Sequence, residues 1–249
     1  MREPRLFIDQ DLAAGRTIAL ARGQAHYLGH VMRLGAGAKV RLFNGRDGEW
    51  RGAIAKIGRN AASVALEAQA RPQEPDGDLW LLFAPVKRAP IDTIATKATE
   101  LGIAAFQPVF TRFTSVGRVN TGRLRANAIE AAEQCGRLTV PEIREPVALD
   151  TLLGEWPADR RLLLCDETGG GRPIADALGA LRTPGGPGKW AVLTGPEGGF
   201  APEELDLLRD LAMLTPVGLG PRLLRADTAA VAALACWQAV LGDWRADSR

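Results

Sequence analysis

From residue 79 onward, short apolar runs alternate with segments of helical spacing. The apolar runs cover residues 79–84, 104–110, 161–165, 190–194 and 216–219. Helical spacing recurs across residues 91–101, 122–136, 173–181 and 228–244, and a further helix is expected to begin near Pro202. Strands that alternate with helices predict a mostly parallel sheet with helices on both faces. The fold class predicted for residues 79–249 is therefore α/β.

Residues 1–70 show a different pattern. Five short runs with partial alternation predict β-strands, and turn signals such as Asn44-Gly45 separate them. The runs cover residues 5–8, 17–20, 39–43, 53–57 and 63–67, and one helical piece interrupts them at 23–34. Strands this short and evenly spaced are typical of a small β-barrel. Residues 71–78 break every periodicity and are expected to be a linker.

The formal net charge of +2 conceals an asymmetry between these parts. Residues 1–70 hold 11 Lys and Arg against 6 Asp and Glu, whereas the remainder holds 20 against 23. The basic first part is either a surface that binds a polyanion or a normally charged surface. Charge alone does not separate the two interpretations.

Several functional classes are disfavoured. No apolar run is long enough for a membrane span, and the first residues lack a signal-peptide core, which predicts a cytoplasmic protein. Cys135, Cys165 and Cys236 form no closely spaced pair, and only His26 and His30 are available to join them. A zinc site or a disulfide framework is therefore not expected, and no metal is predicted.

Two glycine-bearing segments follow apolar runs near the end of the chain. Residues 193–200 read LTGPEGGF, and residues 219–225 read LGPRLLR. Loops at the carboxyl ends of neighbouring parallel strands are where open α/β sheets bind ligands. Glycine lets the backbone approach a ligand closely, although it also permits tight packing of a helix against a strand. The pair of loops predicts a ligand site, with tight packing as the alternative.

Several motifs occur in an order that resembles a known family. They are HYL at 26–28, RLG at 33–35, KATELG at 97–102, EQCGR at 133–137, GPEGGF at 195–200 and LGPRLLRADTA at 219–229. On these segments the chain resembles the RsmE-type 16S rRNA (uracil-N3)-methyltransferases of the SPOUT class. The resemblance implies a PUA-like RNA-binding β-barrel over 1–70, a linker over 71–78, and a SPOUT domain with a C-terminal trefoil knot over 79–249. It also implies an S-adenosyl-L-methionine site in the knot, a homodimer, and a uridine of the decoding region as substrate.

The implied reaction places requirements on the site. N3 of uracil carries a proton, so the site must favour the anion, and a fixed guanidinium near O2 and O4 is a suitable stabiliser. Arg225 is the first candidate, and the alternative is a structural arginine that pairs with Asp227 or caps carbonyls. Glu197 or Asp227 is a candidate proton acceptor, although Glu197 also suits a helix N-terminus and Asp227 also suits a cap of the last helix. The family has Thr-Glu-Thr where this chain has Ala226-Asp227-Thr228, one methylene shorter.

The candidate cofactor-binding residues lie in the two glycine loops and at the end of the preceding strand. They are Thr194, Gly195, Pro196, Glu197, Gly198, Gly199, Leu219, Gly220, Leu223, Leu224 and Asp166. Asp166 and Glu167 either reach the ribose hydroxyls or form a solvated strand end. The candidate RNA-binding residues are Arg5, Arg22, Arg33, Arg112, Arg118, Arg123, Arg125 and Arg137. His26 and His30 are assigned no chemistry.

The last predicted helix is apolar on two stripes. Val231, Leu234 and Leu241 lie on one stripe, and Ala233, Trp237, Val240 and Trp244 lie on the other. One stripe faces the sheet, and the second is covered by another subunit or by another helix of the same domain. We expect a homodimer. Two other functions stay open, namely a non-catalytic RNA-binding ribosome-assembly factor and a SPOUT methyltransferase of another RNA position such as a ribose 2′-hydroxyl.

Overall fold

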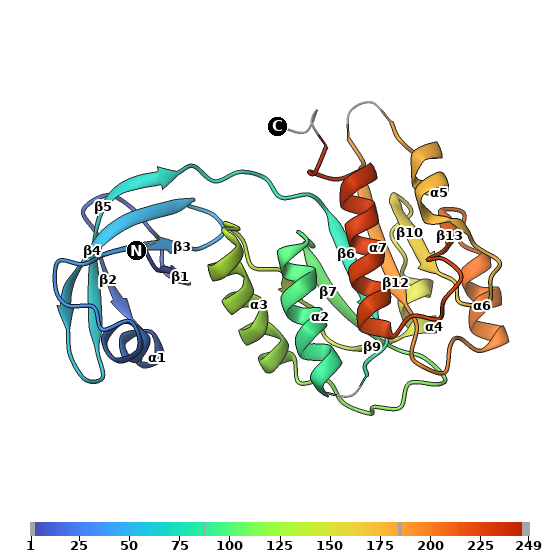
Figure 1. The fold of residues 1–249 in the computed structure, drawn as a ribbon, viewed down its shortest axis with the longest axis horizontal. Helices are drawn as coiled ribbons and strands as arrows, with labels where there is room; N and C mark the ends of the chain where they lie inside the picture. Colours follow the sequence, from blue (N-terminus) through green and yellow to red (C-terminus); the bar gives the residue numbers. More distant parts are fainter. Residues whose placement is uncertain (1–2, 87, 184–185, 246–249) are drawn as a thin grey trace. The chain divides into compact units, whose positions relative to one another are not determined.

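The computed structural model describes residues 3–86, 88–183 and 186–245, with only the backbone described for residues 88–90. The chain packs into two compact units (Figure 1). Unit 1 comprises Met1–Pro75 and Ile129–Val140, and unit 2 comprises Asp76–Ala128 and Pro141–Arg249. Each unit therefore contains two separate stretches of chain. The predicted division into a first domain over 1–70, a linker over 71–78 and a second domain over 79–249 stays a proposal.

Unit 1 is built on a five-stranded mixed sheet with the order β1-β3-β4-β5-β2. Its strands are β1 (Arg5–Phe7), β2 (Thr17–Leu20), β3 (Lys39–Phe43), β4 (Glu49–Ile57) and β5 (Ala62–Arg71). β1 pairs with β3 in parallel, and the other pairs are antiparallel. The predicted helical piece is α1 (Arg22–His26) followed by a π-helical turn, η1 (Tyr27–Val31). Alternate strand residues such as Ile18, Val40 and Val64 fill its core.

The end of helix α3 (Thr121–Cys135) completes unit 1. Ala132 and Leu138 are buried in one cluster with Phe43, and Phe7 packs against it. These contacts join residues about 90 positions apart in sequence. Local periodicity in the sequence does not detect a packing partner so distant along the chain.

Unit 2 contains a parallel sheet with the order β11-β13-β10-β12-β6-β7-β8, and β9 pairs with β7. Its longer strands are β6 (Leu79–Phe83), β7 (Ala105–Phe110), β10 (Arg160–Cys165), β12 (Lys189–Thr194) and β13 (Leu214–Gly218). The two-residue strands are β8 (Glu142–Ile143), β9 (Val147–Ala148) and β11 (Arg172–Pro173). Every pairing is parallel, which confirms the predicted α/β class.

Helices cover both faces of this sheet. α4 (Leu149–Gly154) and α6 (Pro202–Arg209) share a buried cluster with alternate strand residues such as Leu164 and Leu193. α7 (Ala226–Val240) packs on β12 and between α2 (Arg88–Glu100) and α5 (Ile174–Ala180) on the other face. No helix of the described residues is long and apolar enough to cross a membrane. The trefoil knot implied by the resemblance stays a prediction.

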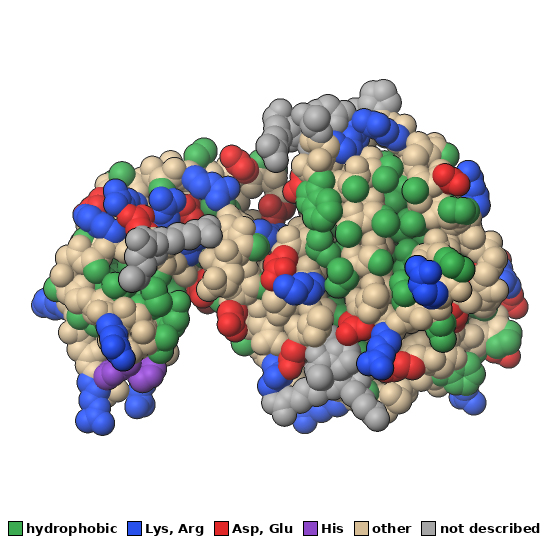
Figure 2. Space-filling model, viewed as in Figure 1, with side chains coloured by type: hydrophobic (Ala, Val, Ile, Leu, Met, Phe, Trp, Pro, Cys, Tyr) green, Lys and Arg blue, Asp and Glu red, His purple; other side chains and the backbone are tan. Residues whose placement is uncertain are grey.

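Helix α7 has an apolar outer face. Ala233, Leu234, Trp237 and Leu241 are buried together, so the two stripes expected from the sequence do not separate into an inner and an outer face. The side chains left partly or fully exposed include Val231, Ala232, Ala235, Cys236, Ala239, Val240 and Trp244. Figure 2 shows hydrophobic side chains gathered over α7 and toward α5. Residues 228–242 contain no charged side chain.

Candidate cofactor site and RNA-contacting residues

Three loops leave the same edge of the unit 2 sheet, where β10, β12 and β13 end. The two glycine loops follow β12 and β13. The sequence predicted that these strands are neighbours, which is wrong, because β10 pairs with both of them and lies between them. The loop at residues 166–171, which follows β10, is therefore the middle of the three.

The middle loop contacts the first glycine loop on one side and the end of β13 on the other. Glu167 Oε1 accepts a hydrogen bond from the Phe200 N–H at 3.3 Å. A Cβ at Gly199, where φ is +73°, would lie 2.3 Å from the same Glu167 oxygen. On the other side, a Cβ at Gly171 would lie 2.4 Å from the carbonyl carbon of Val217. The positive φ of Gly199 favours glycine where the first loop meets Glu167, and at Gly171 a side chain would clash with the backbone of β13.

Thr194 ends β12 beneath the first glycine loop. The residue is 1 % exposed, and its hydroxyl Oγ1 has no hydrogen-bond partner among the described residues. A buried hydroxyl without a partner costs free energy, so its retention suits a ligand that supplies the partner. Thr194 therefore belongs with the residues that can hold a cofactor.

The first glycine loop turns tightly before α6. The Gly199 N–H donates to the Pro196 carbonyl at 3.0 Å, and a Cβ at Gly195 would lie 2.8 Å from the Phe200 ring. Glu197 is exposed on this turn, five residues before α6 begins, so it does not lie in the first turn of that helix. Glu204 is the carboxylate at the helix start, where it accepts the Ala201 N–H.

The second glycine loop ends at Arg225, which is the N-cap residue of α7. Its side chain is exposed and forms no ion pair with any residue that the structure describes, so the alternative pairing with Asp227 is wrong. Asp227 lies inside the helix, where it accepts the Thr228 N–H at 2.8 Å, and so it is not the cap. Leu223 is 86 % exposed, whereas Leu219 and Leu224 are half-buried.

Three residues near the glycine loops make contacts in this structure that the sequence did not predict. Asp166 accepts the N–H and hydroxyl of Thr168, which forms a turn, while Glu167 makes the contact to the first glycine loop. Phe113 is 49 % exposed, and its Cβ lies 3.1 Å from a Cβ built at Gly198. The sequence signal for Phe113 is an aromatic residue in the loop that follows the apolar run 104–110, and Phe113 was not among the predicted site residues.

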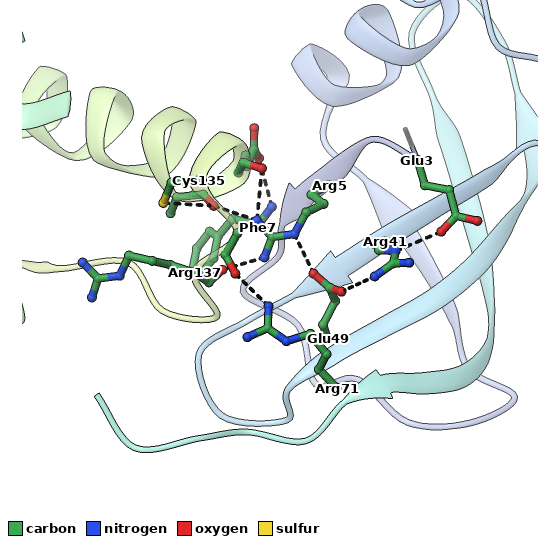
Figure 3. Close-up of polar contacts among 11 residues, drawn as sticks. Glu3, Arg5, Phe7, Arg41, Glu49, Arg71, Cys135 and Arg137 are labelled. Atoms are coloured by element: carbon green, nitrogen blue, oxygen red, sulfur yellow. Dashed lines mark hydrogen bonds and ion pairs between the residues drawn. The ribbon is translucent and has the colours of Figure 1, made fainter. Parts of the chain in front are cut away.

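Arg5 is not an RNA-contacting residue, which corrects the sequence prediction. Its side chain is 5 % exposed and pairs with Glu49 at 2.5 Å (Figure 3). The guanidinium also donates to the carbonyls of Ala132 at 2.8 Å, Glu133 at 3.0 Å and Arg137 at 2.6 Å. Its donors are thereby directed to the carboxyl end of α3 and to the buried carboxylate.

The other arginines differ in their availability. Arg123 forms a two-pronged ion pair with Asp92, and Arg137 donates to the Thr139 hydroxyl at 3.0 Å, so both have intramolecular partners. The exposed members of the predicted set are Arg22, Arg33, Arg112, Arg118 and Arg125.

The EQCGR segment acts within unit 1. Glu133 accepts the Phe7 N–H at 2.9 Å, and Arg71 donates to the Gly136 carbonyl at 2.8 Å. Burial raises the pKa of the Glu133 carboxyl, although the bond from Phe7 acts in the opposite direction. These contacts hold the end of α3 and the residue after it against β1 and β5 within unit 1.

Cys165 is a buried thiol of low reactivity. Burial, with smaller contributions from Glu167 and Cys236, raises the pKa of the Cys165 thiol to about 12. A thiol with so high a pKa is a poor nucleophile. Within the described ranges, no three His, Cys, Asp or Glu residues are grouped to hold a metal ion.

Comparisons with known proteins point to one group. An RNA methyltransferase domain family matches residues 72–238, and an RNA methyltransferase PUA domain family matches residues 20–67. A Rickettsia conorii protein named ribosomal RNA small subunit methyltransferase E is 33 % identical over 94 % of this chain and 95 % of its own. The Neisseria gonorrhoeae protein of that name, solved bound to S-adenosyl methionine, has a TM-score of 0.87 and 25 % identity, covering 98 % of this chain and 100 % of its own. A Legionella pneumophila methyltransferase, solved with bound SAM, has a TM-score of 0.85 and 29 % identity, covering 96 % and 98 %.

Proposed function

Since the chain belongs to the ribosomal RNA small subunit methyltransferase E family of RNA methyltransferases, we propose that it methylates N3 of a specific uridine in the decoding region of 16S rRNA. The methyl donor in this proposal is S-adenosyl-L-methionine, which the solved relatives from Neisseria and Legionella bind. No metal takes part. Ribosomal RNA as substrate implies work in the cytoplasm.

The observation that carries the proposal is the buried Thr194 hydroxyl beneath the first glycine loop, which the loop after β10 contacts through Glu167. We propose that the loops after β12 and β13 hold the cofactor with backbone N–H and C=O groups. Leu219, Leu223 and Leu224 cover its apolar faces. Burying the largely exposed Leu223 side chain against a ligand removes apolar surface from water.

When bound, S-adenosylmethionine would supply the methyl group on its sulfonium sulfur; N3 of the uracil would attack the methyl carbon, and the C–S bond would break to leave a neutral thioether. The base must leave its stack to present its Watson–Crick edge. We propose that Arg225 faces the site from the end of the second glycine loop; in support, its side chain is exposed at the N-cap of α7 and forms no ion pair among the described residues. Its guanidinium stabilises the negative charge on the uracil oxygens.

A carboxylate is proposed to take the N3 proton. Glu197 is exposed on the first glycine loop, whereas Asp227 is held by the Thr228 N–H inside α7. We therefore place Glu197 first and Asp227 second. Asp166, whose Oδ1 holds Thr168, retains its other oxygen for the ribose hydroxyls.

Product mapping tests the reaction directly. Purified protein with S-adenosylmethionine should transfer one methyl group to 16S rRNA from cells that lack this modification. Nuclease digestion and mass spectrometry should then locate the methyl group on the base of one uridine, at N3. A methyl group on a ribose, or no transfer, would contradict the proposal.

Replacing Thr194 with valine tests the cofactor site. We expect the affinity for S-adenosylmethionine to fall about 10-fold, because a hydrogen bond is worth about 0.5–1.5 kcal/mol. The free energy of unfolding should stay the same or rise, since the hydroxyl has no partner among the described residues. Titration calorimetry and thermal unfolding measure the two quantities.

Thr99→Val is the matched control for this prediction. Thr99 is also fully buried in unit 2, and its hydroxyl donates to the Ala95 carbonyl at 2.8 Å. This change should lower stability and leave cofactor affinity unchanged. Equal affinity of Thr194→Val and the unaltered protein would remove Thr194 from the site.

We propose that a second copy of this chain covers the outer face of α7, giving a homodimer. The face is apolar and uncharged along residues 228–242, as an interface between subunits requires. Ala239 is exposed on it. Sedimentation equilibrium should show a dimer for the unaltered chain and a monomer for Ala239→Glu, with the same circular dichroism. A monomeric unaltered chain would contradict the proposal.

A further inference from the structure

Unit 1 presents an exposed surface formed by α1 and η1, called here the α1–η1 surface. It carries the side chains of Arg22, His26, His30, Val31 and Arg33, all of which are exposed. Val31 is 61 % exposed although it is an apolar residue. In Figure 2 the two histidines, coloured purple, lie side by side among Lys and Arg side chains. None of the contacts described for unit 1 uses these two imidazoles to hold the fold.

The two imidazole rings form a stacked pair. The ring centroids of His26 and His30 lie 4.7 Å apart with an interplanar angle of 23°. The backbone beneath them is a π-helical turn, in which the Met32 N–H donates to the Tyr27 carbonyl at 2.9 Å. Such turns are rare and occur often at functional sites. The stack is thus a fixed pair of rings with an outward face.

The backbone that carries the stack is anchored from below. Leu28 is fully buried in the unit 1 core, and a Cβ at Gly29 would lie 3.4 Å from Ile57 at the end of β4. Arg33, which follows the turn, has a φ of +54°, a conformation that residues other than glycine adopt rarely. Arg33 closes this turn, because the Leu34 N–H donates to the Leu28 carbonyl at 2.9 Å, so the end of the surface is fixed to the buried Leu28.

The charge around the stack is positive and unopposed. Residues 12–46 contain no Asp or Glu. Arg22 and Arg33 flank the histidines, and Lys56 and Arg59 lie on the hairpin end that contacts η1. None of these four cations forms an ion pair with an acid that the structure describes. The surface therefore suits an anionic ligand with planar groups.

We propose that the α1–η1 surface binds a single-stranded segment of the RNA substrate. One unstacked base packs on the His26–His30 pair and Val31, and the arginines contact the flanking phosphates. Proteins bind single strands by this combination of exposed rings and cations. An acidic peptide would use the cations and leave the stacked rings without a role. The inference rests on the proposed function, since RNA is the substrate there.

Fluorescence anisotropy of the full chain tests this surface. The probes are a labelled 12-nucleotide single-stranded RNA and the duplex of the same sequence. His26→Ala/His30→Ala should weaken single-strand binding about 10-fold, because stacking is lost, and leave its salt dependence unchanged. Arg22→Ala/Arg33→Ala should weaken binding and reduce the slope of log affinity against log salt by about 1 to 2.

Lys39→Ala is the control, because Lys39 lies in unit 1 but pairs with Glu67. It should bind both probes like the unaltered chain. The inference would be overturned if both double variants bound the single-stranded RNA as tightly as the unaltered chain does. It would also be overturned if the histidine double variant lost affinity for the duplex as much as for the single strand. S-adenosylmethionine affinity of every variant should be unchanged. If the unaltered chain methylates RNA but the double variants bind single-stranded RNA like the unaltered chain, only this inference fails. If the unaltered chain methylates no RNA but the double variants lose affinity for single-stranded RNA, only the proposed function fails.

Discussion

Replacement of Arg225 by alanine is expected to lower the turnover number for methyl transfer about 100-fold to 1,000-fold, while affinity for S-adenosylmethionine changes little. Removing one fixed donor from a developing negative charge has effects of this size. Arg225 is exposed at the start of α7 and forms no ion pair with a described residue, so its loss leaves no buried charge behind. Single-turnover methyl transfer to unmodified 16S rRNA and titration calorimetry measure the two quantities.

Arg222→Ala provides the control, because Arg222 is an exposed arginine in the same loop. Its removal should leave the turnover number within a few-fold. Arg225→Lys should recover only part of the rate, since an ammonium group lacks the planar fork of donors. Equal losses in rate and in cofactor affinity for Arg225→Ala would assign the residue to binding or to structure instead.

Replacement of Arg5 by alanine is expected to lower the stability of unit 1 by about 3–5 kcal/mol, as removal of one partner of a buried ion pair does. Glu49, which is 1 % exposed, would lose its most buried partner and keep only Arg41. Three carbonyls at the end of α3 would lose their donor as well. Hydrogen exchange of the β3 and β4 amides under increasing denaturant measures the change.

The effect of Arg5→Ala should depend on pH. Burial raises the pKa of Glu49, but the bonds and charges of Arg5 and Arg41 outweigh it and hold the pKa below its ordinary value. The stabilisation is therefore complete above the pKa of an unfolded glutamate and is lost as pH falls through the lowered value. The difference between variant and unaltered chain should shrink in acid.

Arg51→Ala is the control for Arg5→Ala. Its ion pair with Glu3 is partly exposed, so the loss should be about 0–1 kcal/mol. Similar losses for Arg5→Ala and Arg51→Ala would show that the buried pair contributes no more than a surface pair.

Local patterns sufficed to predict most of the elements. β3 occupies the predicted residues 39–43, and Gly102 ends its helix with a φ of +80°, as a glycine C-cap should. Lys97 and Glu100 form an ion pair within one helix, at the i,i+3 spacing of the sequence. Two-residue strands such as β11 carry too few residues for any periodicity, so they were not predicted. The π-helical turn was read as an ordinary helix, because its apolar spacing is the same.

The arrangement of the site depended on contacts that are distant in sequence. The two glycine loops were predicted from local composition, but the insertion of β10 between their strands follows from pairing across the whole sheet. Asp166 and Glu167 are predicted either to reach the ribose hydroxyls or to form a solvated strand end, and the contact of Glu167 with the first loop depends on how these strands pair. Arg5 was read as a surface cation because its partners lie about 130 residues away. Periodicity reports which face is apolar and gives no information about such partners.

The discontinuity of unit 1 bears on how the protein is made. Its amino-terminal strands leave the ribosome first, but Ala132, Leu138 and the carbonyls that receive Arg5 come from residues 129–140. During synthesis, the surroundings of Phe43 and of the Glu49–Arg5 pair stay incomplete until roughly the middle of the message has been translated. A chain truncated after Pro75 would retain every strand of the unit 1 sheet but would lack residues 129–140, which complete its packing.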